Sequence, residues 1–160
     1  MKPLVFAVCL GALLVPASAA LAEPARDETL RLVGRTDEMV YFVPARGDEP
    51  RIWMLSAEIV PQMIDDTRVI GSWMELEMDC AGRSLNVREI AVLDEAFGVP
   101  YRESTNRKID PEPGTIYGIV FDHVCKGGPL DRDVTRDFTL DDAVRAAQEQ
   151  KAGREGEFHT

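Results

Sequence analysis

Side chains that serve most catalytic and metal sites are scarce in this chain. It has two histidines and three cysteines among 160 residues, and His159 is the last residue but one. It holds no P-loop, no G-x-S-x-G, no H-E-x-x-H and no G-x-G-x-x-G motif, which mark nucleotide, serine hydrolase, zinc protease and dinucleotide sites. We therefore expect no catalytic residue, no metal site and no cofactor.

Basic residues are also in the minority. The chain has 18 Lys and Arg against 28 Asp and Glu, which gives a formal net charge of -10, and it has no basic run. Phosphate backbones and anionic lipid surfaces are bound mainly by Lys and Arg. This balance argues against a nucleic-acid partner and against attachment to an acidic membrane surface.

The N-terminus carries the pattern of an export signal. Lys2 is followed by the apolar run Leu4–Val15 and then by small residues, as in secretory signal peptides. Pro16 ends the run well short of the roughly 20 apolar residues that span a bilayer. We predict a removed signal peptide at residues 1–22, no stable membrane insertion of the mature chain, and a periplasmic or secreted location.

The cysteines fit the same location. Cys9 lies inside the predicted signal, and Val8 stands before it where a lipobox needs a small residue. Cys80 and Cys125 are then the two cysteines left in an oxidising compartment, where pairs form disulfides. We predict a Cys80–Cys125 bridge, which would stabilise the fold by about 4 kcal/mol for a loop of this length.

The stretch Ser72–Cys80 carries the clearest structural signal. Apolar and polar side chains alternate along it, which is typical of an antiparallel strand with one buried face. Cys80 falls on the apolar side, so we expect it to point into the core. Trp73, Glu75 and Glu77 fall on the other side, and we identify them as a candidate contact face exposed to solvent.

Similar patterns predict the rest of the sheet. The fold class is α+β, with an antiparallel sheet of about five strands. The strands are expected at residues 29–33, 38–44, 51–55, 69–80 and 83–93. In the last of these the apolar residues change face, which predicts either a β-bulge near Arg88 or Glu89 or a strand that changes partner. The segment 56–68, which contains Pro61 and the polar Asp65-Asp66-Thr67-Arg68, is expected as a loop with room for one helical turn, and the polar segment 101–114 is expected as a loop.

Two helices complete the predicted domain, residues 23–151. The segment 115–126 fits both a helical and a two-residue period, and the flanking Thr115 and Gly127 decide for a packed helix. A second helix is expected at 140–150, followed by a flexible tail at 152–160.

Some residues could carry chemistry, although each has a simpler structural explanation. His123 could join Cys80 and Cys125 around a metal, but a disulfide would remove two of these three ligands. The pairs Asp65-Asp66 and Asp141-Asp142 could bind calcium, but they fit a loop and a helix cap first.

Carboxylates on neighbouring strands are a further candidate. They are Glu75, Glu77 and Asp79 on one strand and Asp94 and Glu95 at the end of the next. Paired carboxylates can run glycoside hydrolysis. No partner that would raise the pKa of one of them is evident in the sequence, and a row of carboxylates is also what the solvated face of a strand contains.

Several of these segments occur in an order that resembles a known family. Arg-Ile-Trp-Met-Leu at 51–55 precedes Trp-Met-Glu-Leu-Glu-Met-Asp-Cys at 73–80, and Ile-Asp-Pro-Glu-Pro-Gly-Thr at 109–115 precedes Cys125. Over roughly residues 28–126 the chain resembles the surface-adhesin protein E family of small bacterial envelope proteins. The resemblance implies an antiparallel sheet with a packed helix, a bridge between the two cysteines, and adhesion to host matrix proteins.

We therefore expect an exported, non-catalytic binding or adhesion-type module of the bacterial cell envelope. Its partner would be another envelope protein or an extracellular matrix protein. The alternatives are a small periplasmic hydrolase that uses surface carboxylates, and an accessory subunit that docks through an exposed sheet edge.

Overall fold

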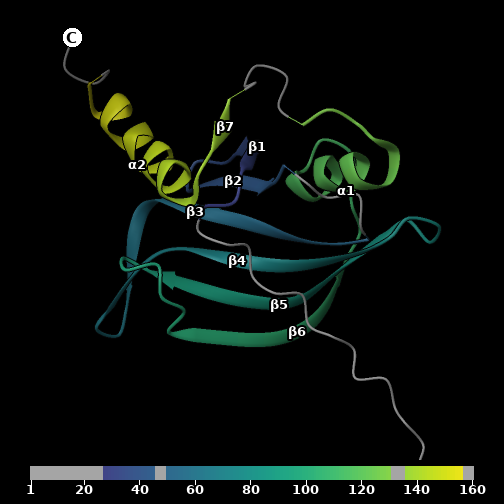
Figure 1. Ribbon diagram of the computed structural model, residues 1–160, viewed down its shortest axis with the longest axis horizontal. Coiled ribbons are helices and arrows are strands. Elements are labelled where there is room, and N and C mark those ends of the chain that lie inside the picture. Colours follow the sequence, from purple (N-terminus) through teal and green to yellow (C-terminus); the bar gives the residue numbers. More distant parts are fainter. Residues whose placement is uncertain (1–26, 46–49, 131–135, 157–160) are drawn as a thin grey trace, which may run out of the picture.

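The computed structural model describes residues 27–45, 50–130 and 136–156 (Figure 1). The predicted signal peptide lies outside these residues. One antiparallel sheet contains all strands of the described chain, in the order β6-β5-β4-β3-β2-β1-β7. The strands are β1 (Leu30–Arg35), β2 (Met39–Pro44), β3 (Arg51–Ile64), β4 (Thr67–Asp79), β5 (Ser84–Asp94), β6 (Tyr101–Ile109) and β7 (Asp137–Phe138), and the helices are α1 (Ile116–Lys126) and α2 (Leu140–Gly156).

The α+β class and the antiparallel sheet are confirmed, but the sheet has seven strands in place of about five. Most of the segment 56–68, which we expected as a loop, continues β3 and begins β4, and only residues 65–66 form the turn between them. Pro61 is accommodated because the β3–β4 register shifts between Ala57 and Gln62. A proline without an N–H fits such a bulge.

The second incorrect expectation is the loop at 101–114, because most of this segment forms the strand β6. This edge strand is largely exposed on both faces. It therefore has no apolar face, and its sequence shows none of the alternation that identifies a half-buried strand. The predicted bulge in β5 is confirmed, since Glu89 pairs with Glu75 and Val87 pairs with Leu76, which leaves Arg88 as the extra residue.

Both faces of the sheet are covered by a helix at one end. Along β3, Trp53 and Leu55 pack in the same apolar cluster as α2, whereas Met54 between them packs in the cluster that contains α1. We call these the α2 face and the α1 face. Figure 1 shows that β5 and β6 lie on the far side of β4 from both helices.

The helix α1 begins and ends as its sequence predicts. Thr115 Oγ1 accepts a hydrogen bond from the Gly118 amide at 3.1 Å, and Gly127 adopts a left-handed conformation with φ 64° after the last turn. Both are standard ways to satisfy the free backbone groups at helix ends. Val120 and Phe121 are buried against the α1 face of the sheet.

The predicted disulfide is present between Cys80 and Cys125. Its surroundings differ from our expectation, because Cys80 is exposed. The strand β4 ends at Asp79, so Cys80 already belongs to the turn that leads to β5. The bridge therefore joins the sheet to α1 at the surface of the molecule.

The helix α2 packs on the sheet through a narrow apolar stripe. Leu140, Ala143, Val144 and Ala147 are buried in the cluster on the α2 face. The helix continues beyond the predicted end at residue 150 to Gly156, which takes in residues 152–156 of the predicted tail. No helix in the described parts of the chain is long and apolar enough to cross a membrane.

Candidate functional site

The predicted contact face is only partly at the surface. Trp73 and Glu75 are buried, with 2% and 5% of their surface exposed. Our expectation of a solvated acidic face was therefore wrong here, because this part of β4 lies in the interior: Trp73 packs in the α2 cluster, and Glu75 is the register partner of the buried Trp53 on β3. Glu77, two residues further along β4, is half-exposed.

A row of polar residues crosses four strands at this position. Arg51 on β3 is the register partner of Glu77 on β4, Glu77 is the partner of Asn86 on β5, and Asn86 is the partner of Lys108 on β6. Directly opposite residues project from the same face of a sheet. The row therefore continues the α2 face where it changes from apolar to polar.

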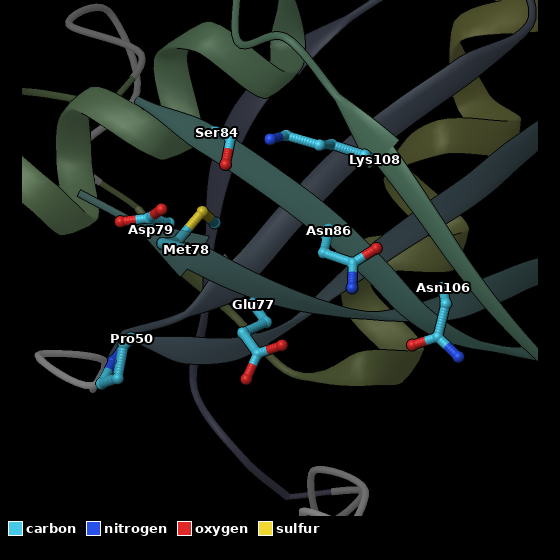
Figure 2. A pocket seen from close by; sticks show the side chains of 8 residues that line it. All are labelled: Pro50, Glu77, Met78, Asp79, Ser84, Asn86, Asn106 and Lys108. Atoms are coloured by element: carbon cyan, nitrogen blue, oxygen red, sulfur yellow. The ribbon is translucent and has the colours of Figure 1, made fainter. Parts of the chain in front are cut away.

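A cleft of about 580 Å³ lies over this row, within the range of small-ligand sites. Figure 2 shows the side chains that line it. We call it the polar cleft, and it is formed by Pro50, Glu77, Met78, Asp79, Ser84, Asn86, Asn106 and Lys108. Most of these residues are polar, and they come from the ends of β4, β5 and β6 and from the residue before β3.

Both carboxylates of the polar cleft take part in structural contacts. Glu77 lies between two guanidinium groups, with Arg51 Nε at 3.7 Å and Arg88 Nη1 at 3.5 Å from its oxygens. Asp79 Oδ1 accepts a hydrogen bond of 2.8 Å from the Gly82 amide in the turn after β4. The carboxylates of Glu77 and Asp79 are thus already paired with arginines or hydrogen-bonded within the protein.

The side of the polar cleft formed by β5 and β6 contains groups that lack hydrogen-bond or ion-pair partners among the described residues. The Asn86 Oδ1 atom is buried and accepts no hydrogen bond from any described residue. Lys108 is exposed, and no carboxylate of the described chain forms an ion pair with its ammonium group. Unpaired amides and ammonium groups are the donors and acceptors with which a protein binds a polar ligand.

Backbone irregularities flank these groups. The bulge at Arg88 lies in β5, and the β5–β6 register shifts between Val87 and Glu89. In β6, Asn106 has a φ of 53°, and Thr105 Oγ1 donates to the Val87 carbonyl at 2.6 Å. Bulges re-aim side chains next to binding sites, and left-handed non-glycine residues are enriched there.

The other residues that the sequence suggested do not form a site together. His123 Nδ1 lies 2.7 Å from the Gly128 carbonyl oxygen just after α1, and the two cysteines that could have joined it around a metal are bonded to each other. No group of three His, Cys, Asp or Glu side chains in the described residues is arranged to hold a metal ion.

Two further carboxylates, Asp94 and Asp142, have structural roles at other positions. Asp94 Oδ1 accepts hydrogen bonds from the Ala96 and Gly98 amides in the β5–β6 turn. Since Asp94 is the register partner of Val69, it lies near the opposite end of β4 from Glu77. Thr139 and Asp142 form a reciprocal contact at the start of α2, as expected for a helix cap.

Sequence reasoning identified Glu77 but missed Asn86, Asn106 and Lys108. Two of these residues lie on β6, the strand without alternation, and the third is a single amide in a strand defined by its apolar neighbours. Only the pairing of β4, β5 and β6 brings the three together. Comparisons of the chain with protein-family models, with curated proteins and with solved structures find no match.

Proposed function

We propose that the protein is an exported, non-catalytic binding module of the bacterial cell envelope that binds its partner at the polar cleft and the neighbouring strand β6. The predicted signal peptide and the Cys80–Cys125 disulfide both suit an oxidising compartment. The resemblance to the surface-adhesin protein E family points to the same kind of location and to a protein partner.

One observation carries the proposal. At one end of the polar row, Arg51 and Glu77 form an ion pair. At the other end, the amide oxygen of Asn86 accepts no hydrogen bond from a described residue, and the ammonium group of Lys108 pairs with no described carboxylate. A buried polar atom without a hydrogen bond costs stability, of the order of 1–3 kcal/mol. A group of this kind beside a cleft is what a binding function would retain.

Binding is favoured over hydrolysis by the state of the carboxylates. A glycosidase needs one carboxyl group as an acid and a second as a base or nucleophile. Glu77 contacts two arginines, and Asp79 holds the β4–β5 turn through the Gly82 amide. Both side chains are thus accounted for by structural contacts.

The proposal is tested by capture of partners on the immobilised mature domain, from envelope extract and from extracellular matrix. The wild-type domain is compared with Asn86→Trp, which fills the polar cleft without adding charge, and with Lys126→Glu as a control on α1. We expect one or more proteins to be retained by the wild type and by Lys126→Glu but not by Asn86→Trp. Equal retention by all three domains would contradict binding at the cleft.

A further inference from the structure

The strand β6 ends the sheet with an unpaired edge. It is the last strand in the sheet order, and no strand of the described chain pairs with its outer side. Seven of its nine residues are exposed. Such an edge presents a row of free N–H and C=O groups, with which an extended segment of another protein can pair as an added strand.

The charge of this edge is opposite to that of the protein. β6 carries Arg102, Arg107 and Lys108 against the single carboxylate Glu103, whereas the chain has a net charge of -10. Arg102 forms an ion pair with Glu89 on β5. The side chains of Arg107 and Lys108 form no ion pair or hydrogen bond with a described residue.

These two cations lie on opposite faces of the sheet because they are consecutive in a strand. Lys108 lines the polar cleft on the α2 face. Arg107 lies on the α1 face, near Tyr117: burial raises the pKa of the Tyr117 phenol, and the positive charge of Arg107 opposes that shift. An incoming strand would therefore meet one positive charge on each of its faces.

We propose that β6 binds an extended segment of a partner protein that carries two adjacent acidic residues, which pair with Lys108 and Arg107. This inference rests on the proposed function and specifies the partner of the same site. Directly opposite side chains of paired strands lie about 5 Å apart at Cβ. One acidic side chain would thus meet the ammonium group of Lys108, and the next would meet the guanidinium group of Arg107 on the other face.

The bulge in β6 restricts what can bind. Asn106 has a φ of 53°, and the pairing with β5 is interrupted between Val87 and Glu89. Bulges and charges on an edge strand discourage indiscriminate pairing. The arm Arg107–Ile109 is therefore the part of the edge where a short acidic segment docks, and its binding should depend on charge and weaken with salt.

A second copy of this chain gains less from the edge than an acidic segment does. If all nine residues of β6 paired antiparallel with those of another copy, Arg102 would lie opposite Lys108 and Glu103 opposite Arg107, and symmetry would repeat both contacts. The like-charged contacts destabilise a strand pair and the opposite-charged contacts stabilise it, so they offset each other. Two acidic residues opposite Arg107 and Lys108 make attractive contacts only.

The test measures binding of labelled nine-residue peptides to the mature, oxidised domain by fluorescence anisotropy at low and high salt. The first peptide is Thr-Val-Thr-Val-Glu-Asp-Val-Thr-Val, the second has Lys-Lys in place of Glu-Asp, and the third is the first with alternate backbone nitrogens methylated. We expect binding of the first peptide only, and at least tenfold weaker binding of it to the double variant Arg107→Glu/Lys108→Glu. Lys126→Glu, a single charge reversal at an exposed position of α1, is the control for a reversed charge elsewhere on the domain.

Three results would overturn the inference. They are equal binding of the Lys-Lys peptide, equal binding of the methylated peptide, or unchanged binding to a folded Arg107→Glu/Lys108→Glu domain. Thermal unfolding checks that the double variant folds; if it does not, Lys108→Gln takes its place, and the three peptides already compare charge and backbone pairing on the wild type. Dimerisation of the wild type that the double variant abolishes would assign the edge to a second copy.

The outcomes also separate this inference from the proposed function. If no peptide binds but the wild-type domain still captures a partner that Asn86→Trp loses, the polar cleft is a binding site and the proposal of an acidic strand is wrong. If neither peptide nor partner binds, both proposals fail.

Discussion

The Cα atoms of Cys80 and Cys125 lie 5.4 Å apart, and their disulfide joins the turn after β4 to the last turn of α1. The turn it holds also contains the Gly82 amide, which donates to Asp79 at the edge of the polar cleft. The bridge thus fixes α1 on the sheet and supports the end of the strand that contributes the acidic wall.

Loss of the bridge should lower the free energy of unfolding. The two cysteines are 45 residues apart, and closing a loop of that length is worth about 4 kcal/mol in the chain-entropy model. Cys80→Ser should show this loss in chemical denaturation of the mature domain. Cys80→Ser/Cys125→Ser should lose the same free energy of unfolding, because both variants lack the same disulfide. An unchanged denaturation midpoint in either variant would exclude a structural role for the disulfide.

A glycine in α1 should resist the usual helix-stabilising substitution. Gly to Ala in a helix normally stabilises by about 1 kcal/mol. At Gly118, however, a Cβ atom would lie 2.0 Å from the carbonyl oxygen of Glu112, so α1 or the preceding loop would have to move. We expect Gly118→Ala to lower the melting temperature, and a higher melting temperature would show that this contact yields easily.

Glu58 should make stability depend on pH. Burial raises the pKa of its carboxyl group, and the neighbouring negative charge of Glu38 adds to the shift. A raised pKa in the folded state means that the folded protein holds the proton more tightly than the unfolded chain does. Ionisation of Glu58 therefore lowers the free energy of unfolding as the pH rises from the unfolded-state pKa through the folded-state pKa. Below the unfolded-state pKa the group has no effect on stability.

Glu58→Gln should therefore be more stable than the wild type at pH 7. The gain should fade as the pH falls below the ordinary value of 4.5 for the glutamate carboxyl. Denaturant unfolding at a series of pH values measures the difference. Glu149→Gln, an exposed substitution on α2, is the control, and a gain that persists unchanged in acid would refute the assigned cause.

The unsatisfied amide oxygen of Asn86 should lower stability and serve binding. Its buried Oδ1 atom accepts no hydrogen bond from a described residue, so Asn86→Leu should raise the free energy of unfolding by about 1 kcal/mol. The same variant should capture less partner than the wild type. A variant that is less stable and binds normally would show that Asn86 serves the fold.

The sequence predicts those parts of the fold that have a buried side. The α1 helix follows from Thr115 and Gly127 at its ends, and the bulge at Arg88 follows from the switch of apolar residues between faces. The strand β6 could not be found in this way, because both of its faces are largely exposed and its residues carry no period.

The buried position of Glu75 was missed for a related reason. Alternation along β4 shows which side chains share a face but not whether a second layer covers that face. Here Trp53 and Trp73 pack in the α2 cluster, and Arg51 accompanies Glu75 at 3.4 Å. A carboxylate beside a buried tryptophan is compatible with the interior because this arginine pairs with it.

Site-specific photo-crosslinking in the producing cells tests binding at the polar cleft most directly. A photoreactive residue is placed at Asn106, which lines the cleft on β6, and separately at Glu149, which is exposed on α2. Binding at the cleft predicts a discrete crosslinked partner from position 106 and none from position 149. No adduct at 106, or the same adducts from both positions, would contradict it.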